Sequence, residues 1–232
     1  MSDRLKHVTA AILAGGQGTR LRAVVADRQK VVAPVAGRPF LYRLLDQLAD
    51  AGVRRIIICT GYQSGQVSDA FGETYRDIEL RYSAEAEPLG TAGALRQALP
   101  LLDSDPILAL NGDSFCETEL PSLLAAHQSQ ATIVVREVPD TTQSGRVEFD
   151  TTGAVTSFIE KGQTTGSGWI SAGVYLLNLE VLASVPVGRA VSIEREVFPV
   201  LVGRGLRVFR TDGRFLDIGT PESYANAQRY FK

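Results

Sequence analysis

The stretch VTAAILAGGQGTRL at residues 8–21 places a short apolar run directly before a cluster of glycines. Residues 8–13 have the length and the apolar character of a buried strand that leads into a turn. Gly15, Gly16 and Gly18 let the backbone adopt positive φ and bring bare N–H groups against a ligand, as phosphate-binding loops require. We therefore expect a ligand loop at the carboxyl end of a buried strand.

Arg20 adds a planar fork of charged donors that suits phosphate oxygens. The alternative is a tight turn with a solvated arginine, and the glycine cluster by itself does not decide between the two. A dinucleotide fingerprint read from Gly16 needs another glycine where Leu21 stands, and the P-loop pattern G-x-x-x-x-G-K-[ST] is absent from the sequence. The loop thus differs from both common phosphate-binding motifs.

The composition is that of a globular domain. With 232 residues, of which 44% are hydrophobic, the chain is long enough to bury a sizeable core. It has no signal-peptide pattern and no apolar run near the length of about 18 residues that a membrane helix needs, so we expect a cytoplasmic protein with no membrane partner. The net charge of −2 gives no basic footprint for nucleic acid. Cys59 and Cys116 lie in no metal-spaced cluster, and we expect no disulfide between them.

Helix and strand patterns alternate along the first half of the chain. The segment PFLYRLLDQLADAG at residues 39–52 has an apolar helical face and ends at a glycine. Strand-like runs at 54–60, 78–82 and 106–111 are separated by helical patterns near 67–71 and at 91–99. This βαβα order predicts an α/β fold with a mostly parallel, Rossmann-like sheet and helices on both faces, in which ligands bind beyond the carboxyl ends of the strands.

The pattern changes from residue 131 onward. Closely spaced strand-like segments follow, with few helical patterns between them, at 131–138, 145–150, 154–160, 169–177 and 206–211. We expect them to form a mixed, partly antiparallel region added to the parallel core. Because no linker or internal repeat separates the two parts, we treat residues 1–232 as a single domain.

Lysine is rare in this sequence, which contains 24 basic residues but only four lysines. Two of the four lie at or near the termini, and the other two are Lys30 and Lys161. A lysine supplies a compact ammonium on a flexible stem where a planar guanidinium does not fit. These two positions are therefore candidates for phosphate contacts, although chance can also leave two lysines there.

Two carboxylates follow apolar stretches far apart in the sequence. Asp113 ends the segment NGD, and Asp217 lies in RFLDIGTP. Brought together, they suit Mg²⁺, which takes few protein oxygens and shares its other positions with water and phosphate. Each aspartate alone is equally well explained as a turn former. In FIEK, Glu160 can accept hydrogen bonds from sugar hydroxyls and Lys161 can meet a phosphate, and a surface ion pair is the alternative.

Taken in order, these motifs resemble the sugar-1-phosphate nucleotidyltransferases, also called nucleoside-diphosphate-sugar pyrophosphorylases. The resemblance runs from about residue 9 to residue 224 and is carried by LAGGQGTRL, the following Lys30, EPLGTAGAL, NGD, FIEK, SAGVY and FLDIGTPESY. The first of these segments is similar to the family signature and is highly specific. The resemblance implies that residues 1 to about 135 form the nucleotide-binding half and residues from about 136 to 232 the sugar-phosphate-binding half.

The resemblance also implies a role for individual residues. It assigns catalysis to Arg20, Lys30 and Asp113, and Mg²⁺ binding to Asp113 and Asp217. The implied nucleotide-binding residues are Leu13, Ala14, Gly15, Gly16, Gly18, Thr19, Arg20, Glu87, Gly90, Thr91 and Asn111. The implied sugar-phosphate-binding residues are Gly112, Gly145, Glu160, Lys161, Ser171 and Gly173.

Two departures from the family pattern limit this transfer. Lys30 lies between Gln29 and Val31, where the family often has prolines on both sides, so we expect a less rigid loop. Ser171 stands where many members have asparagine, which leaves the identity of the sugar open.

Within the family, the sequence looks most like bacterial guanylyltransferases that act on D-glycero-α-D-manno-heptose 1-phosphate. GTP and this sugar phosphate are then the expected substrates, and the product serves surface polysaccharide synthesis.

Glu87 can accept both the N1–H and N2–H donors of guanine, or it is a solvated loop residue. Alternatives are mannose 1-phosphate or an N-acetylated hexose 1-phosphate as the acceptor, UTP as the donor to a hexose 1-phosphate, or a catalytically silent sensor of sugar nucleotides. The last alternative predicts loss of Arg20, Lys30 or an acidic metal ligand, and all are present. Small family members are often homodimers.

Overall fold

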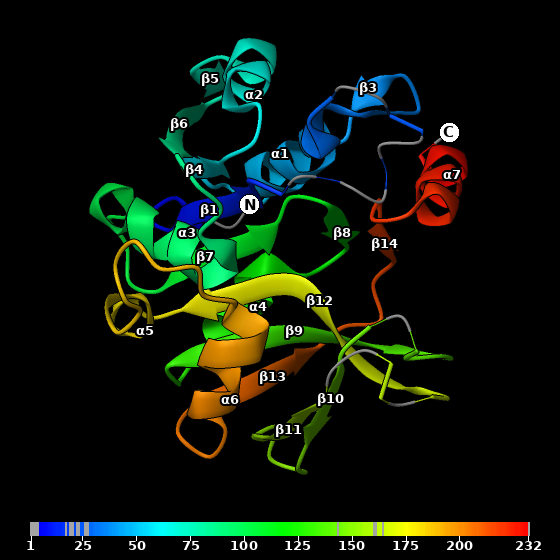
Figure 1. Cartoon of the computed structure of the whole chain (residues 1–232). Coiled ribbons are helices and arrows are strands. Elements are labelled where there is room, and N and C mark those ends of the chain that lie inside the picture. The colour runs from blue at the N-terminus through cyan, green and yellow to red at the C-terminus, as the bar shows by residue number, and fades with distance from the viewer. Residues whose placement is uncertain are drawn as a thin grey trace.

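The computed structural model describes residues 5–16, 18, 21, 24–25, 28–142, 144–159, 162–163 and 165–231. Within these ranges ten strands form one mixed sheet (Figure 1). Eight of them follow one another in the spatial order β11 (Val155–Ile159), β10 (Arg146–Phe149), β12 (Gly168–Leu177), β7 (Ile107–Asn111), β1 (Thr9–Ala14), β4 (Arg55–Thr60), β6 (Ile78–Ala84) and β5 (Thr74–Tyr75). The other two are β9 (Ala131–Val138), which pairs with β12, and β13 (Leu206–Arg210), which pairs with β9.

The parallel core consists of β7, β1, β4 and β6. Successive residues of β1 point to opposite faces, so Ala10 and Ile12 belong to one hydrophobic cluster and Ala11 to another. Both faces are buried, which explains why this strand has a continuous apolar run instead of an alternating one. Leu13 lies beside Asn111 in the register of β1 and β7, so the carboxyl ends of these two strands meet.

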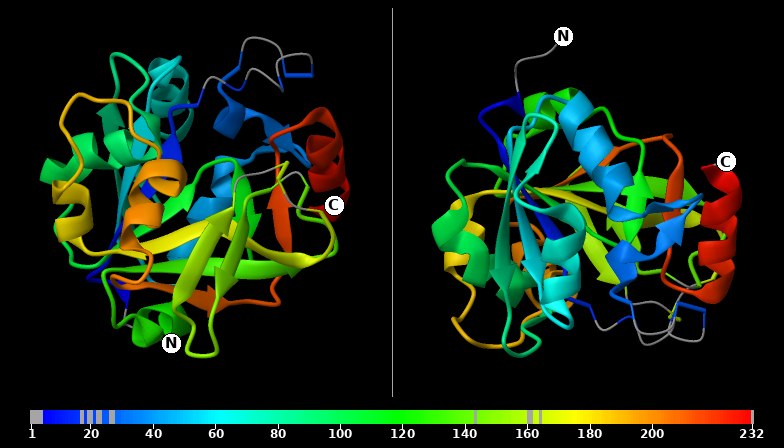
Figure 2. Two further views of the ribbon diagram at one scale, coloured as in Figure 1. Left: turned by 60° about the horizontal axis from the view of Figure 1, so that its bottom comes forward. Right: turned by 90° about the horizontal axis from the view of Figure 1, so that it is seen from above.

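Helices cover both faces of the parallel strands, as the sequence predicts (Figure 2). One hydrophobic cluster contains residues of α1 (Leu41–Asp50), α2 (Ser64–Phe71), α4 (Leu120–Ala126) and α7 (Pro221–Tyr230). The other contains residues of α3 (Gly90–Ala98), α5 (Leu179–Ala183) and α6 (Phe198–Leu201). The leucines of α1 that the helical periodicity places on one face are buried.

The second half extends the sheet with antiparallel strands, in agreement with the change of pattern after residue 131. The long strand β12 pairs antiparallel with β7 of the core and with β9 and β10. Its register with β9 shifts between Ser171 and Tyr175, at the position of the SAG segment. One continuous sheet therefore connects the two halves, and β12 runs directly beside the strand that ends at Asn111.

Several short elements carry no periodic pattern and were not expected from the sequence. A two-stranded antiparallel sheet joins β8 (Ser114–Cys116) to β14 (Phe215–Asp217), and a second joins β2 (Pro34–Val35) to β3 (Arg38–Pro39). The remaining short turns are the 3-10 helices η2 (Lys30–Val32) and η3 (Leu99–Leu101) and the π-helix η4 (Ile193–Val197). Cys59 and Cys116 are buried free thiols, as expected. Across the described ranges, no helix is long and apolar enough to span a membrane.

Candidate active site

A cavity of about 320 Å³ opens where the carboxyl ends of β1 and β7 meet. This is the position that the predicted fold assigns to a ligand. The lining includes nine of the residues singled out in the sequence: Leu13, Ala14, Gly15, Gly16, Lys30, Gly90, Thr91, Asn111 and Asp113. It also includes five residues to which the sequence analysis assigned no role in the site: Gln29, Val31, Glu85, Pro88 and Ala94.

The glycines of the loop differ in their backbone conformation and in their surroundings. Gly18 adopts φ of +60°, a conformation that side chains disfavour. At Gly15 a Cβ atom would lie 2.8 Å from Oε1 of Glu85, the end of a flexible side chain, and 3.4 Å from the backbone nitrogen of Gly61. At Gly16, in contrast, a Cβ atom would meet nothing within 4 Å.

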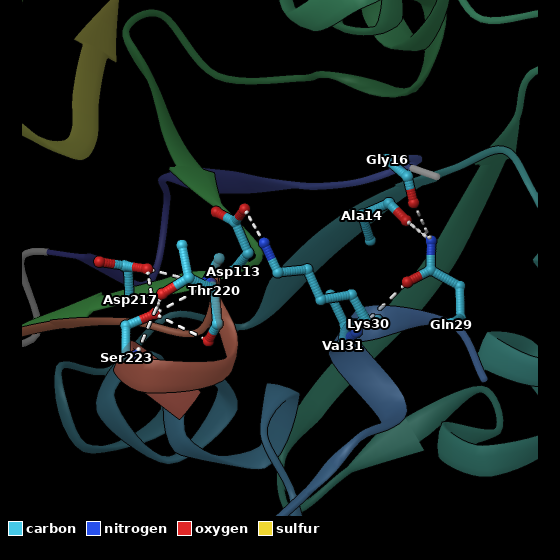
Figure 3. Close-up of polar contacts among 10 residues, drawn as sticks. Ala14, Gly16, Gln29, Lys30, Val31, Asp113, Asp217, Thr220 and Ser223 are labelled. Carbon is cyan, nitrogen blue, oxygen red and sulfur yellow. Dashed lines mark hydrogen bonds and ion pairs between the residues drawn. The ribbon is translucent and has the colours of Figure 1, made fainter. Parts of the chain in front are cut away.

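Lys30 and Asp113 form an ion pair at the cavity. The Nζ atom of Lys30 donates to Oδ2 of Asp113 over 2.6 Å, and the two side chains are 11% and 46% exposed (Figure 3). Lys30 begins η2 and Asp113 follows β7, so the pair joins two segments that flank the cavity. A mostly buried ammonium beside a half-exposed carboxylate can hold a phosphate oxygen while the carboxylate faces a cation.

Gln29 braces the glycine loop against the turn that carries Lys30. Its side chain is almost fully buried, and its Nε2 atom donates to the carbonyl oxygens of Ala14 and Gly16 (Figure 3). Its Oε1 atom accepts the backbone N–H of Val31 over 3.2 Å. The Gln29 amide therefore ties the glycine loop to the turn that carries Lys30. The expectation of a less rigid loop, based on the missing prolines, stays a prediction.

Asp217 lies next to Asp113 because β14 pairs with β8. The backbone N–H of Ile218 donates to the carbonyl of Asp113 over 2.9 Å. The Oδ1 atom of Asp217 accepts from the backbone N–H of Gly219 and from the Ser223 hydroxyl, at 2.7 and 2.8 Å, where α7 begins (Figure 3). A Cβ atom on Gly219 would lie 3.0 Å from this oxygen and 3.6 Å from Nζ of Lys30, so the ammonium also faces this turn.

These two aspartates fit a hard divalent cation. Among the described residues, Oδ1 of Asp113 and Oδ2 of Asp217 have no hydrogen-bond partner. No group of three or more His, Cys, Asp or Glu side chains is placed to hold a metal in the part of the chain that the structure describes. A pair of carboxylates without a protein cage is the donor set that Mg²⁺ uses when phosphate and water complete its shell.

Glu85, and not Glu87, faces the cavity. The Oε2 atom of Glu85 accepts the backbone N–H of Leu89 over 2.7 Å, while burial raises the pKa of its carboxyl group. Glu87 is exposed and is not part of the described lining. A single residue, Ala86, separates the two glutamates in a loop without periodicity. The sequence therefore offered only the position within EPLGTAGAL as a guide, and that guide selected the exposed glutamate.

Several residues that the sequence predicts to bind the sugar phosphate lie around the bulge of β12. Gly173 adopts φ of +72°, and a Cβ atom there would lie 2.7 Å from Oγ of Ser114 and 2.9 Å from Nδ2 of Asn111. A Cβ atom on Gly112 would lie 2.6 Å from the carbonyl oxygen of Leu13. The hydroxyl of Ser171 lies 3.3 Å from that of Tyr175. The SAG bulge therefore packs directly against the end of β7.

The other sugar-side residues are farther along the sheet. Gly145 precedes β10, and a Cβ atom on it would lie 3.3 Å from the carbonyl oxygen of Ile159, the last residue of β11. Four of the sequence-predicted site residues, Thr19, Arg20, Glu160 and Lys161, lie outside the described residues. Their roles stay predictions.

The chain matches the family described as nucleotidyl transferase over residues 9–232. It belongs to this family. The match covers the glycine loop, the Lys30–Asp113 pair and the β8–β14 contact, so every part of the described cavity lies within it.

Relatives of this nucleotidyl transferase carry two kinds of name. It is 34% identical to mannose-1-phosphate guanylyltransferase of Mycobacterium tuberculosis over 94% of this chain, and it spans 63% of the length of that relative. It is 31% identical to D-glycero-alpha-D-manno-heptose 1-phosphate guanylyltransferase of Aneurinibacillus thermoaerophilus, with 95% of this chain and 96% of the relative covered.

Solved structures match this nucleotidyl transferase along nearly its whole length. Two crystal structures of HddC from Yersinia pseudotuberculosis, one of them complexed with GMP-PN, superpose on it with TM-scores of 0.87 and 0.86. Their sequence identities are 34% and 33%, and each covers 97% of this chain and all of the other.

Proposed function

We propose that this nucleotidyl transferase moves the guanylyl group of GTP onto the phosphate of a sugar 1-phosphate, giving a GDP-sugar and pyrophosphate. The observation that carries the proposal is the Lys30–Asp113 pair, which lies at a cavity framed by the glycine loop and the end of β7. D-glycero-α-D-manno-heptose 1-phosphate is the favoured acceptor, supported by the full-length similarity to relatives that bear this name.

In this reaction an oxygen of the sugar phosphate attacks the α-phosphorus of GTP. The new P–O bond forms as the bond from the α-phosphorus to the bridging oxygen of the β-phosphate breaks, and pyrophosphate leaves with that electron pair. The attacking oxygen is already charged, so no strong general base is required, and catalysis rests on positioning and on charge neutralisation. Lys30 supplies a fixed positive charge beside the cavity, and we expect Arg20 to add a second.

We further propose that Asp113 and Asp217 hold Mg²⁺, because their free oxygens and their proximity suit this ion. When bound, Mg²⁺ polarises phosphoryl oxygens and offsets the charge of the triphosphate. The Lys30 ammonium, which lies beside Asp113 in this structure, would contact the phosphate chain.

Guanine recognition is assigned to Glu85. The pair of donors on guanine, N1–H and N2–H, matches one carboxylate, whereas uracil offers a single donor. The Oε1 atom of Glu85 points toward Gly15 at the glycine loop, while its Oε2 atom is fixed by Leu89. A carboxylate at this wall of the cavity therefore favours GTP over UTP.

Mannose 1-phosphate is the second candidate acceptor, because relatives of that name are as similar in sequence as the heptose enzymes.

We assign the nucleotide to residues 1 to about 135 and the sugar phosphate, with Glu160 and Lys161, to the remainder. We place the reaction in the cytoplasm, in the synthesis of capsule or lipopolysaccharide, and expect a homodimer.

The test is a pyrophosphate-release screen that combines the four common nucleoside triphosphates with heptose, mannose, glucose and N-acetylglucosamine 1-phosphates in the presence of Mg²⁺. We expect the wild-type protein to release pyrophosphate with GTP and the heptose phosphate. The Lys30→Met variant should release it at no more than about a hundredth of the wild-type rate. Release with UTP alone, or with none of the pairs, contradicts the proposal.

A further inference from the structure

Glu194 bridges the two sides of the site although it lies in neither set of sequence motifs. It belongs to the π-helix η4, a rare form of helix that is frequent at functional sites. Its Oε1 atom accepts a hydrogen bond from the hydroxyl of Tyr175 on β12 over 2.9 Å. Its Oε2 atom accepts from the hydroxyl of Thr91, a cavity residue at the start of α3, over 3.3 Å.

The segment that carries Glu194 also holds the start of α3 in place. The N–H of Val191 donates to the carbonyl of Leu89 over 2.8 Å, and the N–H of Ala92 donates to the carbonyl of Val191 over 2.9 Å. A Cβ atom on Gly90 would lie 2.6 Å from that same carbonyl oxygen. The cavity wall formed by Gly90 and Thr91 is thus built directly on the residues that precede Glu194.

The carboxylate determines which way the neighbouring hydrogen bonds run, because an ionised carboxylate can only accept. The Thr91 hydroxyl donates its one proton to Glu194 and accepts the backbone N–H of Ile193 over 2.7 Å. A hydroxyl oxygen has two lone pairs, so one lone pair of Thr91 stays available to a ligand. Thr91 therefore acts as an acceptor toward the cavity.

Glu194 also fixes the direction of the hydrogen bond between Tyr175 and Asn111. Burial, and then the nearby charge of Glu194, raise the pKa of the fully buried Tyr175 hydroxyl well above its usual value, so this hydroxyl keeps its proton and donates it to Glu194. Its oxygen then accepts from Nδ2 of Asn111 at 3.5 Å. This arrangement leaves Oδ1 of Asn111 buried at the cavity without a partner among the described residues.

We propose that Glu194 is a positioning residue that makes Thr91 and Asn111 present acceptors to the bound substrates. Resting on the proposed function, this inference assigns N–H or O–H groups of GTP to Thr91 and a donor of either substrate to Asn111. Glu194 touches no substrate in this scheme. It selects ligands by fixing the direction of hydrogen bonds on two walls of the cavity.

The test compares Glu194→Gln with Glu196→Gln, a control on the same turn whose carboxylate accepts the backbone N–H of Ser192. A glutamine brings an N–H donor to face Thr91 or Tyr175, so one of the two hydroxyls must reverse. We expect Glu194→Gln to weaken GTP binding, measured by titration calorimetry without the sugar phosphate, about five- to tenfold, and the control to stay within about twofold.

A double-mutant cycle separates positioning from general stability. Thr91→Val removes the hydroxyl, and we expect it to weaken GTP binding in the wild-type background but to add little in the Glu194→Gln background, since the acceptor is already lost there. Unchanged GTP binding in Glu194→Gln, or fully additive losses, overturns the inference. If Glu194→Gln does not fold, Thr91→Val and Tyr175→Phe decide instead, and unchanged GTP binding in both overturns it.

The proposed function fails in a different way. A wild-type protein that binds GTP but forms no GDP-sugar contradicts the proposed reaction and leaves the comparison of Glu194→Gln with its control intact. Equal GTP dissociation constants for wild type and Glu194→Gln, together with normal turnover, contradict only the role of Glu194.

Discussion

Glu85 holds its carboxyl group half-buried in the cavity wall, and burial raises the pKa of that group above its usual value. The folded protein therefore binds a proton more tightly there than the unfolded chain does. Between the ordinary pKa of a glutamate and the raised one, unfolding releases a proton, so this group makes stability fall as pH rises through that interval. Glu85→Gln removes the effect. The melting temperature of the ligand-free protein, measured from pH 4 to 8, should fall less steeply with pH in Glu85→Gln than in the wild type. Parallel curves for the two proteins would show that Glu85 does not cause this pH dependence.

The same residue should control the choice of base. Replacing the Glu85 carboxylate by an amide removes a charged acceptor for two guanine donors, and we expect kcat/KM for GTP to fall about ten- to a hundredfold with a smaller loss for UTP. Glu87→Gln is the matched control, because Glu87 is exposed two residues away and outside the described lining of the cavity. Equal losses for both nucleotides in Glu85→Gln would remove this residue from base recognition.

Substitutions of Lys30 and Lys161 should affect different steady-state kinetic constants. Lys30 lies at the cavity beside Asp113, where charge shifts as the α-phosphate is attacked, so Lys30→Met should mainly lower kcat, on the order of 10²–10³-fold. Lys161→Met should mainly raise KM for the sugar phosphate and leave KM for GTP nearly unchanged. Arginine should rescue neither fully, because its planar fork places the charge elsewhere. The reverse assignment of the two effects would require exchanging the two substrate sides.

The proposed Mg²⁺ site depends on the pairing of two short strands. The pairing of β8 with β14 brings Asp113 and Asp217 together. Asp113→Asn and Asp217→Asn should therefore each raise the Mg²⁺ concentration that gives half-maximal turnover, since a neutral amide is a poorer ligand for a hard cation. Ser114→Ala, which keeps both carboxylates, is the control. Unchanged Mg²⁺ titrations in both aspartate variants would exclude them from the metal site.

The elements that sequence patterns predict are those with enough length to show a period. Strand β1 and helix α1 follow from an apolar run and from leucines at helical spacing. Strands β8 and β14 have three residues each, too few to show alternation, and their pairing is set by the fold around them. The sequence could therefore name Asp113 and Asp217 as a pair but could not say what joins them.

The side chains that sequence reasoning missed act through tertiary contacts. Gln29 braces the glycine loop and Glu194 bridges Thr91 and Tyr175, and each contact spans segments that no local pattern connects. Glu85 differs from Glu87 only by which residue the loop turns inward. Motif spacing found nine cavity residues because these lie on the loop, the strand ends and the helix start that the fold itself positions.

In the whole molecule, one sheet carries the residues of both proposed substrate sides. The parallel core ends at the glycine loop and Asn111, and β12 continues the sheet antiparallel beside β7, so the bulge at Ser171 lies next to the nucleotide cavity. In the proposed reaction, this arrangement brings the sugar phosphate and the triphosphate together on one continuous sheet. It also explains why Glu194, which follows β12 in the chain, can reach both sides.

The proposed reaction is defined by which phosphorus of GTP is attacked. Purified enzyme is incubated with Mg²⁺, D-glycero-α-D-manno-heptose 1-phosphate and GTP labelled with ³²P at either the α- or the γ-position, and the products are separated. The account predicts that α-label appears in the GDP-sugar and γ-label only in pyrophosphate, with both signals lost in Lys30→Met. Label from the γ-position on the sugar, or no α-label in any sugar nucleotide, would contradict it.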